Sequence, residues 1–140
     1  MTIKTTVHLN FRGQARAALE FYQSVFGGQI VLATYAQAGT AEVPAQAEQI
    51  TWGQVESAEG FRVMAYDVQP SRGFEAGENS VFVSVRGETS EEIQHYWDKL
   101  GDGATVIQPI GPAGWSPLYG MLKDRFGVTW VLDVAVAYAG

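Results

Sequence analysis

Hydrophobic and polar positions alternate between strand-like and helix-like periods along the chain. The β-branched run "TTVHLNF" predicts a strand at Thr6–Phe11. In "ARAALEFYQSVFGG" the apolar residues recur at helical spacing, and Gly27 and Gly28 follow as a stop signal. "QIVLATYA" predicts a second strand, whereas the polar segment Gln37–Gln49 predicts a loop. "ITWGQVE" and "FRVMAYDV" predict two further strands, joined by a turn at "SAEG". The first part of the chain is therefore expected to fold as strand, helix and three strands.

The same order of elements returns in the second part of the chain. "QPSRGFEAGEN" contains Pro and Gly and predicts a linker at about residues 70–78. "SVFVSV" predicts a strand, and "TSEEIQHYWDKLG" predicts a helix with a capping box of Thr89 and Glu92. "ATVIQPI" predicts a strand, "GPAGWSPL" a Gly/Pro loop, and "YGMLKDRFGVTWVLDV" a hairpin that turns at "KDRFG". One domain, residues 1–140, is thus expected to contain two modules, 1–69 and 79–140.

An offset of 74 residues aligns the two predicted helices. It places Leu19, Tyr22, Phe26 and Gly27 on Ile93, Tyr96, Leu100 and Gly101, and it places His8 on Phe82. Such an internal repeat indicates a fold built from two copies of one module. A single module of this size is too small to bury its sheet well, so two modules should pack together or the chain should dimerise. The predicted class is α+β with paired βαβββ modules.

Composition narrows the range of partners. The formal net charge is −6 and the pI is about 4.8, and no Lys or Arg run occurs, so nucleic acid and anionic membranes are not expected partners. The chain has no cysteine, which excludes disulfides, thiolate nucleophiles and zinc–thiolate sites. No signal-peptide core and no membrane-length apolar window occur. We therefore expect a cytoplasmic protein.

Three stretches resemble the vicinal oxygen chelate superfamily, also called the glyoxalase/bleomycin-resistance/dioxygenase superfamily. They are "ARAALEFYQSVFGG", "NSVFVSV" and "WSPLYGMLKDRFGVTW". Within the superfamily the chain is most similar to the PhnB-like branch, which is also labelled 3-demethylubiquinone methyltransferase-like. The resemblance implies paired modules whose mixed sheet forms a cup, and a homodimer. Superfamily members include glyoxalases, dioxygenases, epimerases and drug-sequestering proteins, so the fold alone does not define an activity.

The resemblance also implies where a metal would bind. In superfamily enzymes the ligands are His, Glu or Gln on the first and last strands of each module. The first strand offers His8, and the matching strand offers Phe82, with Ser80 or Ser84 as its polar groups. The usual carboxylate position, four residues past the turn glycine, is occupied by Val131 and by Met64 in the first module. His8 is thus the one candidate ligand, and we expect no metal.

Aromatic residues provide the other candidate chemistry. The residues expected to line the cup and bind a ligand are Trp52, Tyr66, Trp115 and Tyr119, with Arg62 for an anionic group. Trp115 serves equally well as a dimer contact, and Trp130 is expected in the core. Asp124 is expected to be a turn residue that bonds its own backbone. Arg125 and His95 are expected to be solvated.

The leading hypothesis is a metal-free, small-molecule-binding protein without an assigned activity. The first alternative is a divalent-metal lyase, isomerase or dioxygenase that uses His8. The second alternative is a bleomycin-type drug-sequestering protein, because an acidic cup would attract a cationic drug.

Overall fold

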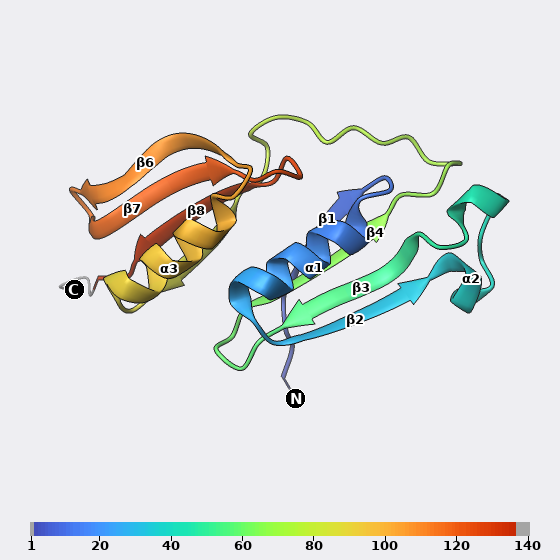
Figure 1. Ribbon diagram of the computed structural model, residues 1–140, viewed down its shortest axis with the longest axis horizontal. Coiled ribbons are helices and arrows are strands. Elements are labelled where there is room, and N and C mark those ends of the chain that lie inside the picture. The colour runs from blue at the N-terminus through green and yellow to red at the C-terminus, as the bar shows by residue number, and fades with distance from the viewer. Residues whose placement is uncertain (1, 137–140) are drawn as a thin grey trace. The chain divides into compact units, whose positions relative to one another are not determined.

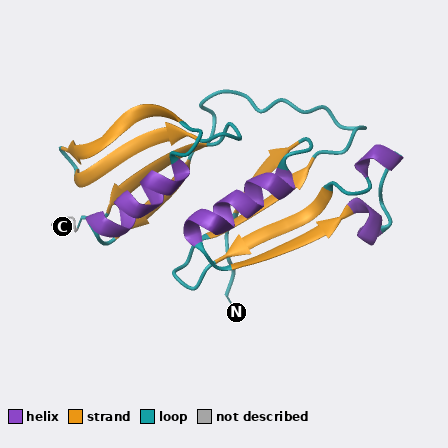
Figure 2. Cartoon of the chain, in the orientation of Figure 1, coloured by secondary structure: helices purple, strands orange, loops and turns teal. Residues whose placement is uncertain are grey.

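A computed structural model describes residues 2–136, and the chain divides into two compact units, Met1–Ala76 and Gly77–Gly140 (Figure 1). Each unit contains a four-stranded mixed sheet and one long helix (Figure 2). The predicted α+β class and the βαβββ order of each module are therefore confirmed. Among the described residues, no helix has the length and apolarity needed to cross a membrane.

Unit 1 is a sheet with strand order β1-β4-β3-β2, in which β1 and β4 are parallel and the other pairs are antiparallel. Its elements are β1 (Val7–Phe11), α1 (Ala15–Phe26), β2 (Gln29–Thr34), α2 (Tyr35–Ala38), a 3₁₀ turn (Pro44–Gln46), β3 (Ile50–Glu56) and β4 (Arg62–Asp67). The predicted second strand ends early because the Thr34 side chain caps α2. The predicted loop 37–49 contains the 3₁₀ turn.

Helix α1 covers one face of the unit 1 sheet with the apolar positions that its periodicity predicted. Leu19 and Tyr22 are fully buried. The backbone approaches so closely that a Cβ atom on Gly53 would lie 2.4 Å from Leu19 Cδ1. Gly53 therefore faces α1, and its neighbours on β3 face the opposite side, because successive strand residues alternate.

The carboxylate of Asp67 joins three parts of unit 1. It is buried and accepts hydrogen bonds from the backbone N–H groups of Gly13 (2.7 Å), Ala15 (3.1 Å) and Ile50 (2.9 Å). The α1 N-cap residue, Gln14, makes no side-chain cap, so Asp67 supplies this function from a remote strand. Tyr35 donates its hydroxyl proton to the Asp67 carbonyl at 2.6 Å, and burial raises the pKa of Tyr35.

The segment after β4 is tied back onto unit 1. Glu42 accepts hydrogen bonds from the Ser71 amide (3.0 Å) and hydroxyl (2.6 Å), which lower the pKa of the Glu42 carboxyl group. Arg12 donates to the carbonyls of Gln69 and Arg72. The first residues of the predicted linker are therefore held by side-chain contacts to unit 1.

Unit 2 repeats the arrangement, with strand order β5-β8-β7-β6. Its elements are β5 (Val83–Gly87), α3 (Ser90–Leu100), β6 (Thr105–Ala113), β7 (Ser116–Lys123) and β8 (Thr129–Val134). Thr89 caps α3 by accepting from the Glu92 amide, which is the Thr89 half of the predicted capping box. Gly120 is the counterpart of Gly53, since a Cβ atom there would lie 2.8 Å from the Trp97 ring. Gly120 therefore faces α3.

The turn between β7 and β8 is built around Asp124. Its buried carboxylate accepts from the amides of Phe126 (2.8 Å) and Val128 (3.0 Å), and from Trp130 Nε1 (2.9 Å). Asp124 is thus the turn residue that the sequence predicted, and it also anchors Trp130, which is fully buried in the core as expected.

In unit 2 one predicted loop is wrong, and one predicted strand begins later than expected. "GPAGWSPL" is not a loop, because β6 continues to Ala113 and β7 begins at Ser116, which leaves only a tight turn between them. Pro112 lies in β6, which is an edge strand, and edge strands are where proline occurs in sheets. The strand predicted from "SVFVSV" begins only at Val83.

Candidate functional site

The face of the unit 1 sheet opposite α1 holds three of the predicted ligand-binding residues. Strand pairing places its side chains in two rows, and we call this set the helix-free face of unit 1: His8, Met64, Gln54 and Val31, then Asn10, Tyr66, Trp52 and Ala33. Arg62 lies one step further along β4. Trp52 is 39% exposed although large aromatic side chains usually lie buried. This face therefore combines aromatic and apolar side chains with polar ones, of which His8 and Asn10 lie at its β1 edge.

His8 lies at the β1 edge of this face with two side-chain neighbours. Its Nδ1 atom is 2.9 Å from Asn10 Oδ1. Its ring meets the Tyr66 ring edge-on, with the centroids 5.2 Å apart and the planes at 74°. The ring of His8 is therefore held by one side chain of its own strand and one of the neighbouring strand β4.

Arg62 is engaged within unit 1. Its guanidinium donates to the Thr5 carbonyl at 3.0 Å and to the Thr6 hydroxyl. These bonds fix the segment that precedes β1. Arg62 lies on the predicted face, and its role toward an anionic ligand stays a prediction.

The corresponding helix-free face of unit 2 is defined by the pairing of β5, β8, β7 and β6. Its residues are Ser84, Val131, Met121 and Gln108 in one row, and Arg86, Asp133 and Tyr119 in the next. Trp115, in the β6–β7 turn, is 56% exposed and packs edge-on against Tyr119, with ring centroids 5.2 Å apart. The predicted pair Trp115 and Tyr119 therefore forms one aromatic contact in unit 2.

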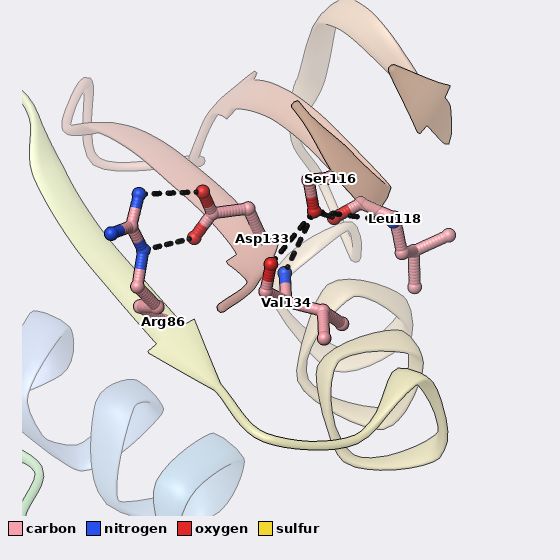
Figure 3. A network of polar contacts seen from close by, with 5 residues as sticks. All are labelled: Arg86, Ser116, Leu118, Asp133 and Val134. Carbon is pink, nitrogen blue, oxygen red and sulfur yellow. Dashed lines mark hydrogen bonds and ion pairs between the residues drawn. The ribbon is translucent and has the colours of Figure 1, made fainter. Parts of the chain in front are cut away.

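An ion pair lies next to this aromatic contact. Arg86 Nε and Nη2 donate to the two Asp133 carboxylate oxygens at 3.1 and 3.0 Å (Figure 3). The Asp133 side chain is only 5% exposed, whereas that of Arg86 is 52% exposed. On the side of Asp133 away from Arg86, Ser116 Oγ lies 2.8 Å from the carbonyls of Leu118 and Val134 and joins the start of β7 to the end of β8 (Figure 3). Both carboxylate oxygens of Asp133 thus accept hydrogen bonds from Arg86.

The donor set of the superfamily metal site is not present on these faces. Pairing places His8 beside Met64, and Ser84 beside Val131. Ser84, not Phe82, is therefore the counterpart of His8, which corrects the offset used for the first strands. Met64 and Val131 supply no oxygen or nitrogen ligand, so neither strand pair by itself offers the three or more such ligands that a divalent ion needs. Within residues 2–136, no three His, Cys, Asp or Glu side chains are grouped to hold a metal ion.

Other sequence predictions are settled by side-chain positions. His95 is exposed on α3, as expected. Arg125 is exposed but pairs with Asp102 at 2.9 Å. The sequence reasoning missed Asn10 and Arg86. The i, i+2 spacing of His8 and Asn10 on a predicted strand was the available signal for Asn10, because such residues share a face.

The two sheets with their helix-free faces define a protein of the glyoxalase/bleomycin-resistance/dioxygenase fold. A glyoxylase/bleomycin resistance protein/dioxygenase domain from Frankia sp. EAN1pec has this fold, with a TM-score of 0.67, 10% identity, and coverage of 97% of this chain and 99% of that chain. Within that class, the chain belongs to the family described as 3-demethylubiquinone-9 3-methyltransferase, the PhnB-like branch, whose model matches residues 3–132.

Two solved structures are similar in sequence as well as in fold. Protein PA1353 from Pseudomonas aeruginosa is 27% identical, with a TM-score of 0.82 over 95% of this chain and 98% of that chain. A PhnB protein from Bacillus cereus is also 27% identical, with a TM-score of 0.74 over 95% of this chain and 100% of that chain. No curated protein matches the chain significantly. The resemblance seen in the sequence is therefore confirmed.

Proposed function

We propose that this protein binds a small organic molecule against the aromatic residues of its helix-free faces, and that it does so without a metal ion. The observation that carries the proposal is that Trp52 and Tyr66, which flank the paired residues Gly53 and Ala65, share the sheet face that α1 does not cover. Flat aromatic side chains next to a few polar groups suit a planar or apolar ligand. Trp115 and Tyr119 provide a second aromatic contact of the same kind in unit 2.

The four tryptophan indole N–H groups allow a direct test. A fragment library is titrated into ¹⁵N-labelled protein while the four indole resonances are observed. The resonances of Trp52 and Trp115 should shift, whereas those of Trp97 and Trp130, which are buried, serve as internal controls. Trp52→Ala should remove binding at the unit 1 face. A library in which no fragment shifts the Trp52 or Trp115 resonance would refute the proposal.

The metal-dependent alternative makes a different prediction. If His8 were a metal ligand with others supplied by unexpected residues or a partner chain, purified protein would contain stoichiometric metal that His8→Ala loses. Because Met64 beside His8 and Val131 beside Ser84 supply no metal ligand, we expect no stoichiometric metal in the purified protein. Metal analysis of both proteins separates the two functions.

Drug sequestration is a further candidate, supported by the net charge of −6. A cationic glycopeptide should then raise the melting temperature. The absence of a shift at saturating drug would remove this candidate.

We further propose that the protein is a cytoplasmic homodimer. Exposed apolar residues on both units, including Val31 and Val106, support association with a second copy. Light scattering coupled to size-exclusion chromatography tests the dimer, and a monomer mass at all concentrations would contradict it.

A further inference from the structure

We propose that His8 is a hydrogen-bond acceptor for the ligand of unit 1, and that Asn10 is the positioning residue that gives it this role. The inference rests on the proposed small-molecule function. It assigns to His8 a part in ligand recognition that requires no metal. It also names the ligand class, a planar or apolar molecule that carries an O–H or N–H donor.

The side chains of His8 and Asn10 are in contact. The two residues are two positions apart on β1, so their side chains share the helix-free face. Asn10 Oδ1 lies 2.9 Å from His8 Nδ1, and an amide oxygen can only accept. Nδ1 must therefore carry the proton in this contact. A neutral imidazole has one donor and one acceptor nitrogen, so Nε2 is left as the acceptor.

Tyr66 holds the plane of the ring. The edge-on contact between the His8 and Tyr66 rings adds a second constraint to the Asn10 bond. Tyr66 also pairs with Asn10 across β4 and β1, so the three side chains form one cluster. An acceptor that is held in place before binding loses less freedom on binding than a freely rotating one.

The surroundings of His8 define the ligand. Met64 lies beside His8 on β4, and Tyr66 and Trp52 follow in the next row of the helix-free face. A ligand whose flat apolar part rests on these side chains can direct a donor toward Nε2 at the β1 edge. A ligand without a donor would keep the apolar contacts and lose the bond to His8.

The tautomer of His8 is tested first in the free protein. Two-bond ¹H–¹⁵N correlations on ¹⁵N-labelled protein distinguish a protonated from an unprotonated ring nitrogen. The spectra are recorded at about pH 9, where free imidazole is neutral. We expect the proton of His8 on Nδ1, whereas His95, the other histidine, should show the Nε2–H form that free histidine prefers in water. A protonated Nε2 on His8 would overturn the proposal.

Two variants of Asn10 separate positioning from a general structural effect. Asn10→Leu removes the acceptor, so His8 should return to the tautomer of His95. Asn10→Asp retains an acceptor oxygen, so the proton should stay on Nδ1. If Asn10→Leu leaves the His8 tautomer unchanged, Asn10 is not the positioning residue.

A matched pair of probes then tests recognition. 2-Naphthol carries an O–H donor, and 2-methoxynaphthalene has a similar ring system without it. From the net worth of one hydrogen bond, 2-naphthol should bind about three- to tenfold more tightly. His8→Phe keeps a ring against Tyr66 but has no acceptor, so this preference should vanish. The shift of the Trp52 indole resonance gives both affinities.

The outcomes separate the two proposals. Equal binding of both probes to the parent protein would overturn the role of His8 and leave the binding face intact. Failure of both probes to bind would count against the proposed function, and with it the role of His8. If His8→Phe still prefers 2-naphthol, the O–H group of the probe donates to a residue other than His8, and the role of His8 is overturned.

Discussion

The buried carboxylate of Asp67 should contribute more to stability than any exposed carboxylate of unit 1. Asp67→Ala removes the acceptor of three backbone N–H groups, those of Gly13, Ala15 and Ile50. A buried N–H left without an acceptor costs about 1–3 kcal/mol. Because Gly13 is exposed, water can replace one of these bonds, and the two that remain give an expected loss of about 2–6 kcal/mol. Such a loss is a large part of the stability of an ordinary domain.

Urea unfolding followed by far-ultraviolet circular dichroism measures this loss. Glu20→Ala is the control, because it removes an exposed carboxylate from α1 of the same unit and should cost less than about 0.5 kcal/mol. Asp67→Asn keeps one acceptor oxygen and should lie between the two. Hydrogen exchange at the Ile50 amide should accelerate in Asp67→Ala. If the free energy of unfolding of Asp67→Ala lies within about 1 kcal/mol of that of Glu20→Ala, the carboxylate does not stabilise unit 1 as its contacts indicate.

Three further predictions follow from local geometry. Gly28→Ala should destabilise the fold by more than about 2 kcal/mol, because φ is 92° and a Cβ would lie 2.3 Å from a β3 carbonyl. Gly27→Ala, where φ is 74° but no atom lies within 4 Å, is its control in urea unfolding and should cost less. Asp124→Ala should cost about 2–4 kcal/mol and shift the indole resonance of Trp130, and an unchanged resonance would contradict the assigned bond. Burial raises the pKa of Tyr35, so the Tyr35 hydroxyl of the unfolded chain loses its proton at a lower pH than that of the folded chain. The free energy of unfolding should therefore fall as the pH rises above about 10. Tyr35→Phe should make the alkaline fall in the free energy of unfolding shallower, and an identical pH profile would contradict this.

Local patterns were sufficient for the helices and for the final turn. The apolar stripe of α1 and the cap at Thr89 are properties of a few neighbouring residues, so they are visible in the sequence. Asp124 was interpretable for the same reason, since a carboxylate that bonds amides two and four residues ahead is a local arrangement. Its bond to Trp130 follows from the hairpin that this turn begins.

Register between distant strands was not available from local patterns. The offset that aligned the helices placed His8 on Phe82, but the pairing of β5 with β8 makes Ser84 the counterpart. The connection between strand and helix is shorter in unit 2 than in unit 1, so one offset cannot align both elements. A strand that moves by two residues keeps its face and changes its neighbours.

The sequence by itself determined the repeated βαβββ order, the family, and the apolar residues at the usual carboxylate positions. These features depend on periodicity and on residue identity along short segments. Tertiary structure alone decided that Asp67 caps α1 from a distant strand, that Arg86 pairs with Asp133, and that Tyr66 packs against the ring of His8. Each of these contacts depends on which side chains strand pairing and helix packing bring together, and that placement is a non-local property of the folded chain.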